Sequence, residues 1–401
     1  MIHKFVKTNG KLSTIIVAFD AGSRSESNSL DGITYNSGIA HMLEHCIFKG
    51  TKTRSANDIN REVAYLGGYI NAFTSHEKVQ YYITVPSENI EKCMEILSDI
   101  IFNSTFPEEE FQKEREVVKE EEISRNDNPM QYIYSEFSKN FFSNYLGKEI
   151  IGTQDTISKF TRDEVAQFHK THCGRERAVV SLCSNISRSY AKTLMSKYFG
   201  ISSGKIDTKV KYEDTKFFDS KTLEITKSGI EHSYSFIGFP VRKKLINKRP
   251  EISVMDVILT SGMDSRLFTE VREKRGLVYG IGGFQFLSET GGVFGINFST
   301  RDKNIVEANS VVKDELERIK SSFVTEEELQ RAKNKLKAEI YSAAESSNSM
   351  ASMAVKEVLD NLPSLKEYSD RIHRTTLEDI KSISNDIFDF DKTLNVICRK
   401  E

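Results

Sequence analysis

The sequence predicts an α+β fold of two similar domains, each a mostly antiparallel β-sheet packed with helices. Three observations predict it. The 401 residues are more than one hydrophobic core of ordinary size holds. The strand and helix patterns of the first half recur in the same order in the second half. A polar stretch from Gly200 to Thr215, without apolar periodicity, separates the halves. We therefore expect domains at 1–199 and 218–401, joined by a linker at 200–217.

The individual elements follow from the spacing of apolar residues, which is two in strands and about 3.6 in helices. In the first half we expect strands near 13–20, 69–74, 78–85 and 177–183, and helices near 37–49, 56–66, 87–103, 107–126, 161–171 and 187–199. In the second half we expect strands near 232–239, 279–286, 292–299 and 393–398, and helices near 250–260, 264–274, 303–320 and 325–358. The repeat is too long for a solenoid and indicates a duplicated domain.

Composition excludes several classes of partner and location. The 56 basic and 58 acidic residues give a net charge of −2, so nothing indicates binding to nucleic acid. No apolar run approaches the length of a membrane span, and the first residues resemble neither a secretory signal nor a transit peptide. The five cysteines show no C-x-x-C spacing, which is typical of reduced thiols. We expect a cytoplasmic protein without a membrane partner.

The segment His41-Met42-Leu43-Glu44-His45 predicts a metal site. Residues four apart lie on one face of a helix, so His41 and His45 can bind one metal ion together. Glu44 lies close enough to act on a water molecule at that ion. The apolar residues around the motif predict a packed helix, in which two unpartnered imidazoles would be costly. This order of residues is the inverted zinc-peptidase motif H-x-x-E-H.

A third ligand should be acidic and should come from another element. In the run from Glu114 to Glu122, Glu114, Val117, Val118 and Glu121 fall on one helical face. Acidic runs are usually solvated, and this interpretation suits Glu120. Because Glu121 shares its face with two valines, we select it as the ligand and Glu114 as a carboxylate near the site. Glu122 is the alternative ligand.

These motifs resemble those of the pitrilysin/insulinase family of zinc peptidases. The similarity is greatest to its half-size branch, which includes the mitochondrial processing peptidase beta subunit and homodimeric bacterial relatives. The family's third ligand is a Glu about 76 residues after the second His, and here 121 − 45 = 76. The resemblance implies one Zn²⁺ per chain, held by His41, His45 and Glu121. It also implies that Glu44 is the general base and Glu114 an accessory catalytic carboxylate.

Two further blocks match the family. The first contains Gly68, Asn71, Ala72 and Phe73, in a glycine-rich segment whose simplest interpretation is an ordinary hairpin. In relatives this segment is an edge strand that pairs with extended substrate. The second contains Arg272 and Tyr279, which relatives use to hold substrate. Basic residues before a glycine are also expected at any helix C-terminus.

His169 and His172 are a weaker candidate for a metal site. They lie three residues apart at a predicted helix end, but no distant acid or cysteine pair completes a shell. We expect both to serve packing.

The resemblance implies a zinc-dependent endopeptidase that hydrolyses extended or unfolded peptides inside a chamber. Each chain would be half of a clamshell, and both motif sets in one chain imply a homodimer. Two alternatives stay open, a processing peptidase that cuts one defined site and a non-catalytic peptide-binding or scaffold subunit. The second would require a damaged zinc motif, and His41, Glu44 and His45 are intact.

Overall fold

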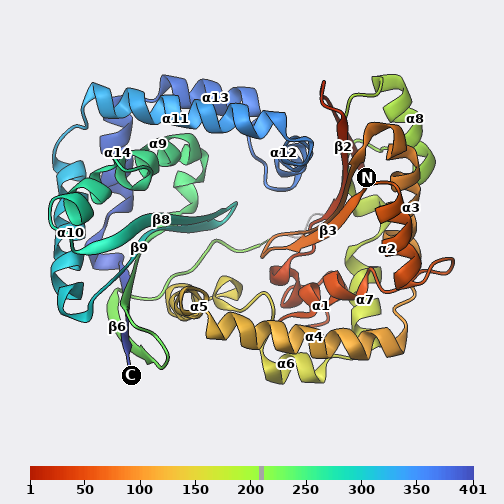
Figure 1. Cartoon of the computed structure of the whole chain (residues 1–401), viewed down its shortest axis with the longest axis horizontal. Coiled ribbons are helices and arrows are strands. Elements are labelled where there is room, and N and C mark those ends of the chain that lie inside the picture. Colours follow the sequence, from red (N-terminus) through yellow and green to blue (C-terminus); the bar gives the residue numbers. More distant parts are fainter. Residues whose placement is uncertain (207–211) are drawn as a thin grey trace. The chain divides into compact units, whose positions relative to one another are not determined.

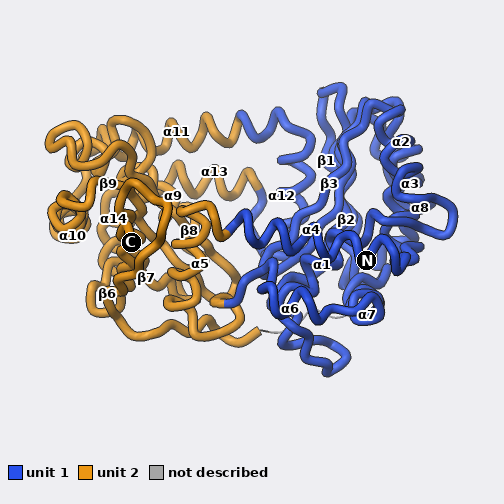
Figure 2. The backbone as a smooth tube through the Cα atoms, turned by 60° about the horizontal axis from the view of Figure 1, so that its bottom comes forward, with its two compact units in different colours: residues 1–125, 148–211, 342–364 blue, residues 126–147, 212–341, 365–401 orange. Residues whose placement is uncertain are grey.

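The computed structural model describes residues 1–206 and 212–401, so part of the linker predicted at 200–217 lies outside the described residues. The chain forms two compact units, each built from three segments (Figure 2). Unit 1 contains 1–125, 148–211 and 342–364, and unit 2 contains 126–147, 212–341 and 365–401. The continuous domains predicted at 1–199 and 218–401 therefore exchange segments with each other.

Unit 1 is built on a five-stranded sheet with the order β1-β5-β2-β4-β3. Its strands are β1 (Ile2–Lys7), β2 (Leu12–Phe19), β3 (Tyr69–Thr74), β4 (Val79–Pro86) and β5 (Val179–Ser184). Only the β1–β5 pair is parallel; the others are antiparallel. The strand β3 forms one edge of this sheet, so one side of its backbone pairs with β4 and the other has no neighbouring strand among the described residues.

Unit 2 repeats this arrangement with the order β6-β10-β7-β9-β8. Its strands are β6 (Lys221–Lys227), β7 (Ser233–Arg242), β8 (Val278–Ser288), β9 (Gly291–Thr300) and β10 (Leu394–Lys400). The β6–β10 pair is parallel and the rest are antiparallel. The predicted α+β fold with two similar, mostly antiparallel sheets is confirmed.

The helices of unit 1 cover both faces of its sheet. They are α1 (Ile39–Cys46), α2 (Ala56–Tyr65), α3 (Ile90–Asn103), α4 (Glu108–Asp127), α6 (Gln154–Lys159), α7 (Arg162–His172), α8 (Arg188–Phe199) and α12 (Ser347–Leu359). The helices α2, α3 and α8 lie on one face, and α12 lies on the other (Figure 1). Alternation along β2 serves both layers, because Ile15 and Val17 join the larger core while Ile16 and Ala18 contact α12 residues.

The helices of unit 2 are α5 (Pro129–Phe141), α9 (Arg249–Thr260), α10 (Ile305–Ser321), α13 (Leu365–Arg374) and α14 (Leu377–Ile387), with α11 (Glu326–Glu345) leading out of it. The exchange places α5, from the first half of the sequence, on β10 and β7, where Phe137 packs with Phe236 and Val396. Likewise α12, from the second half, packs on β5, β2 and β1, where Val355 contacts the apolar core. One of the helices that cover each sheet thus comes from the other half of the sequence.

Several predicted elements differ from the structure. The helix predicted at 325–358 breaks at Ser346, whose hydroxyl accepts a hydrogen bond from Ser349 N and starts α12. The helix predicted at 264–274 contains a wider π-type turn at Phe268–Glu273. Two edge strands, β1 and β6, were not predicted, because their lysines and other polar residues obscure the apolar alternation.

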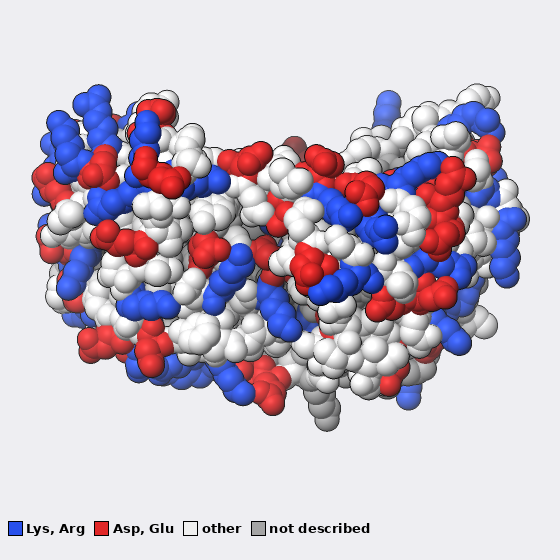
Figure 3. All heavy atoms as spheres, turned by 90° about the horizontal axis from the view of Figure 1, so that it is seen from below, with Lys and Arg blue, Asp and Glu red and all other residues white. Residues whose placement is uncertain are grey.

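The surface carries both signs of charge. On the face shown in Figure 3, acidic and basic side chains are interspersed, as the 56 basic and 58 acidic residues lead one to expect. Within residues 1–206 and 212–401, no helix combines the length and the apolar character needed to cross a bilayer.

Candidate metal centre

The helix α1 presents both histidines of the sequence motif on one side. It begins at Gly38, which has a φ of 103°, and its buried residues Ile39, Met42 and Leu43 fix its other faces in the core of unit 1. The ring centroids of His41 and His45 lie 4.8 Å apart. One turn of helix therefore brings the two imidazoles close enough to share one ion.

Glu121 on α4 completes the group. Its Oε2 lies 3.3 Å from Nε2 of His45 and 3.8 Å from Nε2 of His41. The three potential ligand atoms all lie within 4.8 Å of one another, and the described part of the chain contains this one group of three or more His, Cys, Asp and Glu residues with such spacing. Two nitrogens and one carboxylate oxygen are the donor set of catalytic zinc sites.

The neighbouring acids of α4 point elsewhere. Glu122 Oε2 accepts a hydrogen bond of 2.8 Å from Gln154 Nε2, and Glu120 is exposed. The structure therefore brings Glu121 to the histidines instead of Glu122. Of the two valines on the predicted face, Val118 is buried whereas Val117 is 49% exposed.

Glu114 lies behind His45. Its Oε2 is 3.1 Å from Nδ1 of His45, and its Oε1 is 2.7 Å from Nζ of Lys49. This contact fixes the orientation of the imidazole and leaves Nε2 to face Glu121. Sequence analysis placed Glu114 near the site but missed Lys49, whose position four residues after His45 on the continuing chain was the available signal.

Glu44 lies beside the ligands and contacts the end of β3. Its Oε2 accepts a short hydrogen bond from the Thr74 hydroxyl. Burial raises the pKa of Glu44, and the Thr74 hydrogen bond partly opposes this rise. The carboxylate is therefore more basic than an exposed one. Thr74 ends the glycine-rich segment but was given no role from the sequence.

The two histidines have opposite electrostatic environments. Burial, together with the charge of His45, lowers the pKa of His41 to about 4. Burial also lowers the pKa of His45, but its contacts with Glu114 and Glu121 outweigh burial and raise the pKa to about 9. Within the described residues, Nδ1 of His41 is buried without a hydrogen-bond partner. The Nε2 atoms of both imidazoles face the Glu121 carboxylate, so two nitrogens and one oxygen can ligate one ion and the residues fit zinc.

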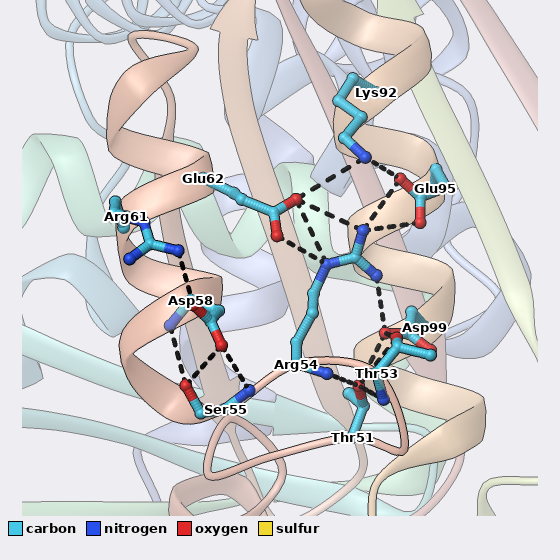
Figure 4. Close-up of polar contacts among 10 residues, drawn as sticks. All are labelled: Thr51, Thr53, Arg54, Ser55, Asp58, Arg61, Glu62, Lys92, Glu95 and Asp99. Atoms are coloured by element: carbon cyan, nitrogen blue, oxygen red, sulfur yellow. Dashed lines mark hydrogen bonds and ion pairs between the residues drawn. The ribbon is translucent and has the colours of Figure 1, made fainter.

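The loop that follows α1 is held by Arg54. Its guanidinium lies 2.7 Å from Asp99 and 2.8 Å from Glu95 on α3, and 3.2 Å from Glu62 on α2 (Figure 4). The Thr51 hydroxyl also donates to Asp99, at 2.7 Å. This network ties the loop to two helices and so restricts the C-terminal side of α1.

The predicted substrate residues of unit 1 lie along its sheet edge. Asn71, Ala72 and Phe73 belong to β3, and Gly68 precedes it. The absence of a side chain at Gly68 allows close packing, because a Cβ there would lie 3.0 Å from Val63 Cγ1. The backbone of β3 is the exposed edge that the sequence predicted.

Arg272 and Tyr279 lie together in unit 2. The guanidinium carbon of Arg272 is 5.0 Å from the ring centroid of Tyr279, which is the geometry of a cation–π contact. Tyr279 is 85% exposed at the start of the edge strand β8. Tyr279 is thus presented to solvent, while Arg272 is half-buried beside it.

His169 and His172 each have a structural contact. His169 Nε2 lies 2.8 Å from the Ile101 carbonyl oxygen, and His172 Nε2 lies 2.9 Å from the Ser29 hydroxyl. These contacts tie α7 to α3 and to the loop before α1.

Comparison with known proteins places these features in a family. The protein-family model described as insulinase (peptidase family M16) matches residues 5–154. A second family model, described as the peptidase M16 inactive domain, matches residues 159–336. The uncharacterized zinc protease YmxG of Bacillus subtilis is 31% identical over 379 residues, which cover 94% of this chain and 90% of the relative. An uncharacterized zinc protease of Rickettsia bellii is 34% identical over 311 residues, which cover 77% of this chain and 74% of the relative.

Solved structures show the same fold. A protease from Helicobacter pylori superposes with a TM-score of 0.88 at 24% identity, covering 98% of this chain and 96% of the other. The crystal structure described as a peptidase M16 inactive domain from Pseudomonas fluorescens gives a TM-score of 0.87 at 19% identity, covering 99% and 95%. From the matched family models and the relatives along nearly the whole chain, we conclude that the protein belongs to peptidase family M16, the insulinase/pitrilysin family.

Proposed function

We propose that the protein is a zinc-dependent endopeptidase that hydrolyses extended or unfolded peptides. The observation that carries this proposal is the convergence of His41, His45 and Glu121, with the carboxylate of Glu44 beside them. The relatives named zinc proteases support it. A zinc ion held by these residues would supply Lewis acidity, which polarises a peptide carbonyl and lowers the pKa of water at the site.

Glu44 is the proposed general base. It would take the proton of the attacking water and later pass it to the leaving amine. Oε2 already accepts the Thr74 hydroxyl, so Oε1 is the oxygen that would hold this proton. The burial that raises the pKa of Glu44 makes its carboxylate a stronger base than an exposed one. Glu114 and Lys49 would hold His45 in its ligating orientation.

The edge strand β3 is the proposed docking place for substrate. An extended peptide can pair with the open side of this strand through backbone hydrogen bonds. Such bonds do not depend on the side chains of the peptide. Thr74 links the end of this strand to Glu44, so a docked peptide would run toward the catalytic carboxylate. Asn71, Ala72 and Phe73 would contact its side chains.

A homodimer is the proposed assembly, in which two chains close as a clamshell around a chamber. The half-buried Arg272 and the exposed Tyr279 would then hold substrate for the zinc domain of the partner chain. This part of the proposal rests on the presence of both motif sets in one chain of 401 residues.

Purified protein loaded with zinc tests the proposal directly. We expect it to cleave a quenched-fluorescent peptide, to lose activity with a chelator and to regain it with added zinc. The variant Glu120→Gln is a matched control, because Glu120 is exposed on the same helix, and it should behave like the wild type. Absence of cleavage by protein that carries one zinc per chain, across peptides of different sequence, would contradict the proposal and favour a peptide-binding role.

A further inference from the structure

The helix that carries the metal ligands has no capping side chain of its own. It starts after Gly38, a residue that offers no side-chain oxygen to the free N–H groups of the first turn. N–H groups at this end of the helix instead donate to one side-chain carboxyl group from earlier in the chain. Glu26 Oε1 lies 3.1 Å from Gly38 N and 3.1 Å from Ala40 N. The positive end of the helix dipole favours a carboxyl oxygen at this position.

Glu26 is itself held rigidly. It is 3% exposed and ends the short 3₁₀ helix Ser23–Glu26, which runs against the turn between β3 and β4. Ser23 N donates to the Ser75 carbonyl and Arg24 N donates to the His76 carbonyl, both at 3.0 Å. A Cβ on Gly22 would lie 2.4 Å from the backbone of His76, so only glycine permits this approach.

A buried ion pair strengthens the same contact. Arg24 is 1% exposed, and its Nη1 lies 2.8 Å from Oε1 of Glu77 in the turn. Breaking a buried pair of this kind is costly, because the remaining charge stays buried without its partner. The segment that carries Glu26 and the turn that follows β3 therefore behave as one rigid block.

The same block also reaches the functional end of α1. Thr74 directly precedes Ser75 in the turn, and its hydroxyl donates to Glu44. The block thus contacts α1 twice, through Glu26 at the first turn and through Thr74 near the ligands. Two contacts on one short helix fix both its position and its rotation.

We propose that Glu26 is a positioning residue for the metal centre. Through the N-terminus of α1 it sets the register between the metal ligands and strand β3. Its link to catalysis rests on the proposed peptidase function, whereas its effect on metal binding does not. The acceptor oxygen is the essential feature of the side chain. The Gly38 and Ala40 N–H groups need a hydrogen-bond acceptor, and the side chain must be long enough to bring its oxygen to them.

Three substitutions separate the ionisable group, the reach of the side chain and the acceptor oxygen. Glu26→Gln keeps an amide oxygen at the same distance, Glu26→Asp withdraws the oxygen by one methylene, and Glu26→Ala removes it. Glu315→Ala is the matched control, since Glu315 is also a buried glutamate, 2% exposed, but belongs to unit 2. Each variant is made in the full chain. Zinc affinity is measured by competition with a chelator, peptide cleavage by kcat and KM, and stability by thermal unfolding.

We expect Glu26→Gln to bind zinc within about threefold of the wild type, and Glu26→Asp and Glu26→Ala to lose about tenfold or more in zinc affinity, as other outer-sphere variants do. Their kcat should fall more than their KM rises, because the ligands and Glu44 are misplaced while β3 is intact. Glu315→Ala should lose stability and keep its zinc affinity.

The reading of these results does not depend on peptidase activity. If the wild type binds zinc but cleaves no peptide, the proposed function fails, and the zinc affinities still decide the role of Glu26. Wild-type zinc affinity in a folded Glu26→Ala would overturn the inference. If Glu26→Ala does not fold, wild-type zinc affinity in Glu26→Asp would overturn it equally. An equal loss of zinc affinity in Glu315→Ala would also overturn it, because the effect would then reflect general destabilisation.

Discussion

Glu114 Oε2 lies 3.1 Å from His45 Nδ1, so one nitrogen of this imidazole is held from behind while the other faces Glu121. The carboxylate of Glu114 is held in turn by Lys49 at 2.7 Å. Such contacts around a metal site fix the tautomer of the ligating histidine and increase its basicity. The candidate metal centre therefore extends beyond its three potential ligands.

Glu114→Ala should lower zinc affinity by about 10- to 100-fold, the usual effect of removing a partner of a ligating histidine. Chelator competition measures this directly. Glu116→Gln is the control, because Glu116 is exposed on the same helix and pairs with Lys119. An unchanged affinity in Glu114→Ala would mean that His45 needs no support from this side.

Glu121→Gln should lose most of its bound zinc, because a neutral amide is a poor substitute for a carboxylate ligand. Glu122→Gln should keep its zinc, since Glu122 accepts a hydrogen bond from Gln154 instead. Metal content after gel filtration compares the two. Loss of zinc from Glu122→Gln alone would show that the ligand is one residue further along α4.

The protonation of His172 should contribute to the pH dependence of the free energy of unfolding. Burial, together with the charge of Arg177, lowers the pKa of this fully buried histidine from 6.5 to about 4. The unfolded chain therefore binds a proton that the folded chain excludes, so stability is complete above pH 6.5 and falls as the pH drops toward 4. The largest loss from this group is on the order of 3 kcal/mol.

Urea unfolding of metal-free protein between pH 4 and 7 measures this loss. His172→Gln removes the titration and should give a shallower slope than the wild type, whereas the exposed His373→Gln should leave the slope unchanged. Identical slopes in all three proteins would show that His172 takes up its proton in the folded state.

Mixed dimers test the proposed assembly. Glu44→Gln and the double variant Arg272→Ala/Tyr279→Phe should each be weakly active alone. Co-expressed, they can form a dimer in which one site pairs an intact zinc domain with an intact Arg272 and Tyr279. Activity should then return toward about half that of the wild type per mixed dimer, because one of its two sites is intact, if the two sites act independently. No recovery in verified mixed dimers, or a fully active monomer by light scattering, would show that one chain completes its own site.

Local patterns predicted much of this structure. The strand expected at 69–74 is β3 at the same residues, and the helix expected at 37–49 contains α1. Local periodicity suffices there, because a strand alternates its side chains and a helix places i and i+4 on one face. The spacing from His45 to Glu121 identified a residue of α4 that the structure brings to the histidines.

Long-range placement was not predictable in the same way. No helix was predicted at α5, α12 was predicted as part of a longer helix, and periodicity could not show that each packs on the sheet of the other half. The cap of α1 comes from Glu26, twelve residues before Gly38, and no local motif marks it. Val117 lies on the predicted face yet is 49% exposed, because an apolar residue on such a face need not be buried.

The central claim is that Glu44 transfers the proton in peptide hydrolysis but is not a ligand of the zinc ion. Glu44→Gln tests it most directly, with zinc content and kcat measured on the same preparation. We predict zinc content equal to the wild type and a kcat lower by at least about 10²- to 10⁴-fold, the contribution of a general base. Full zinc occupancy with undiminished peptide cleavage would contradict the claim.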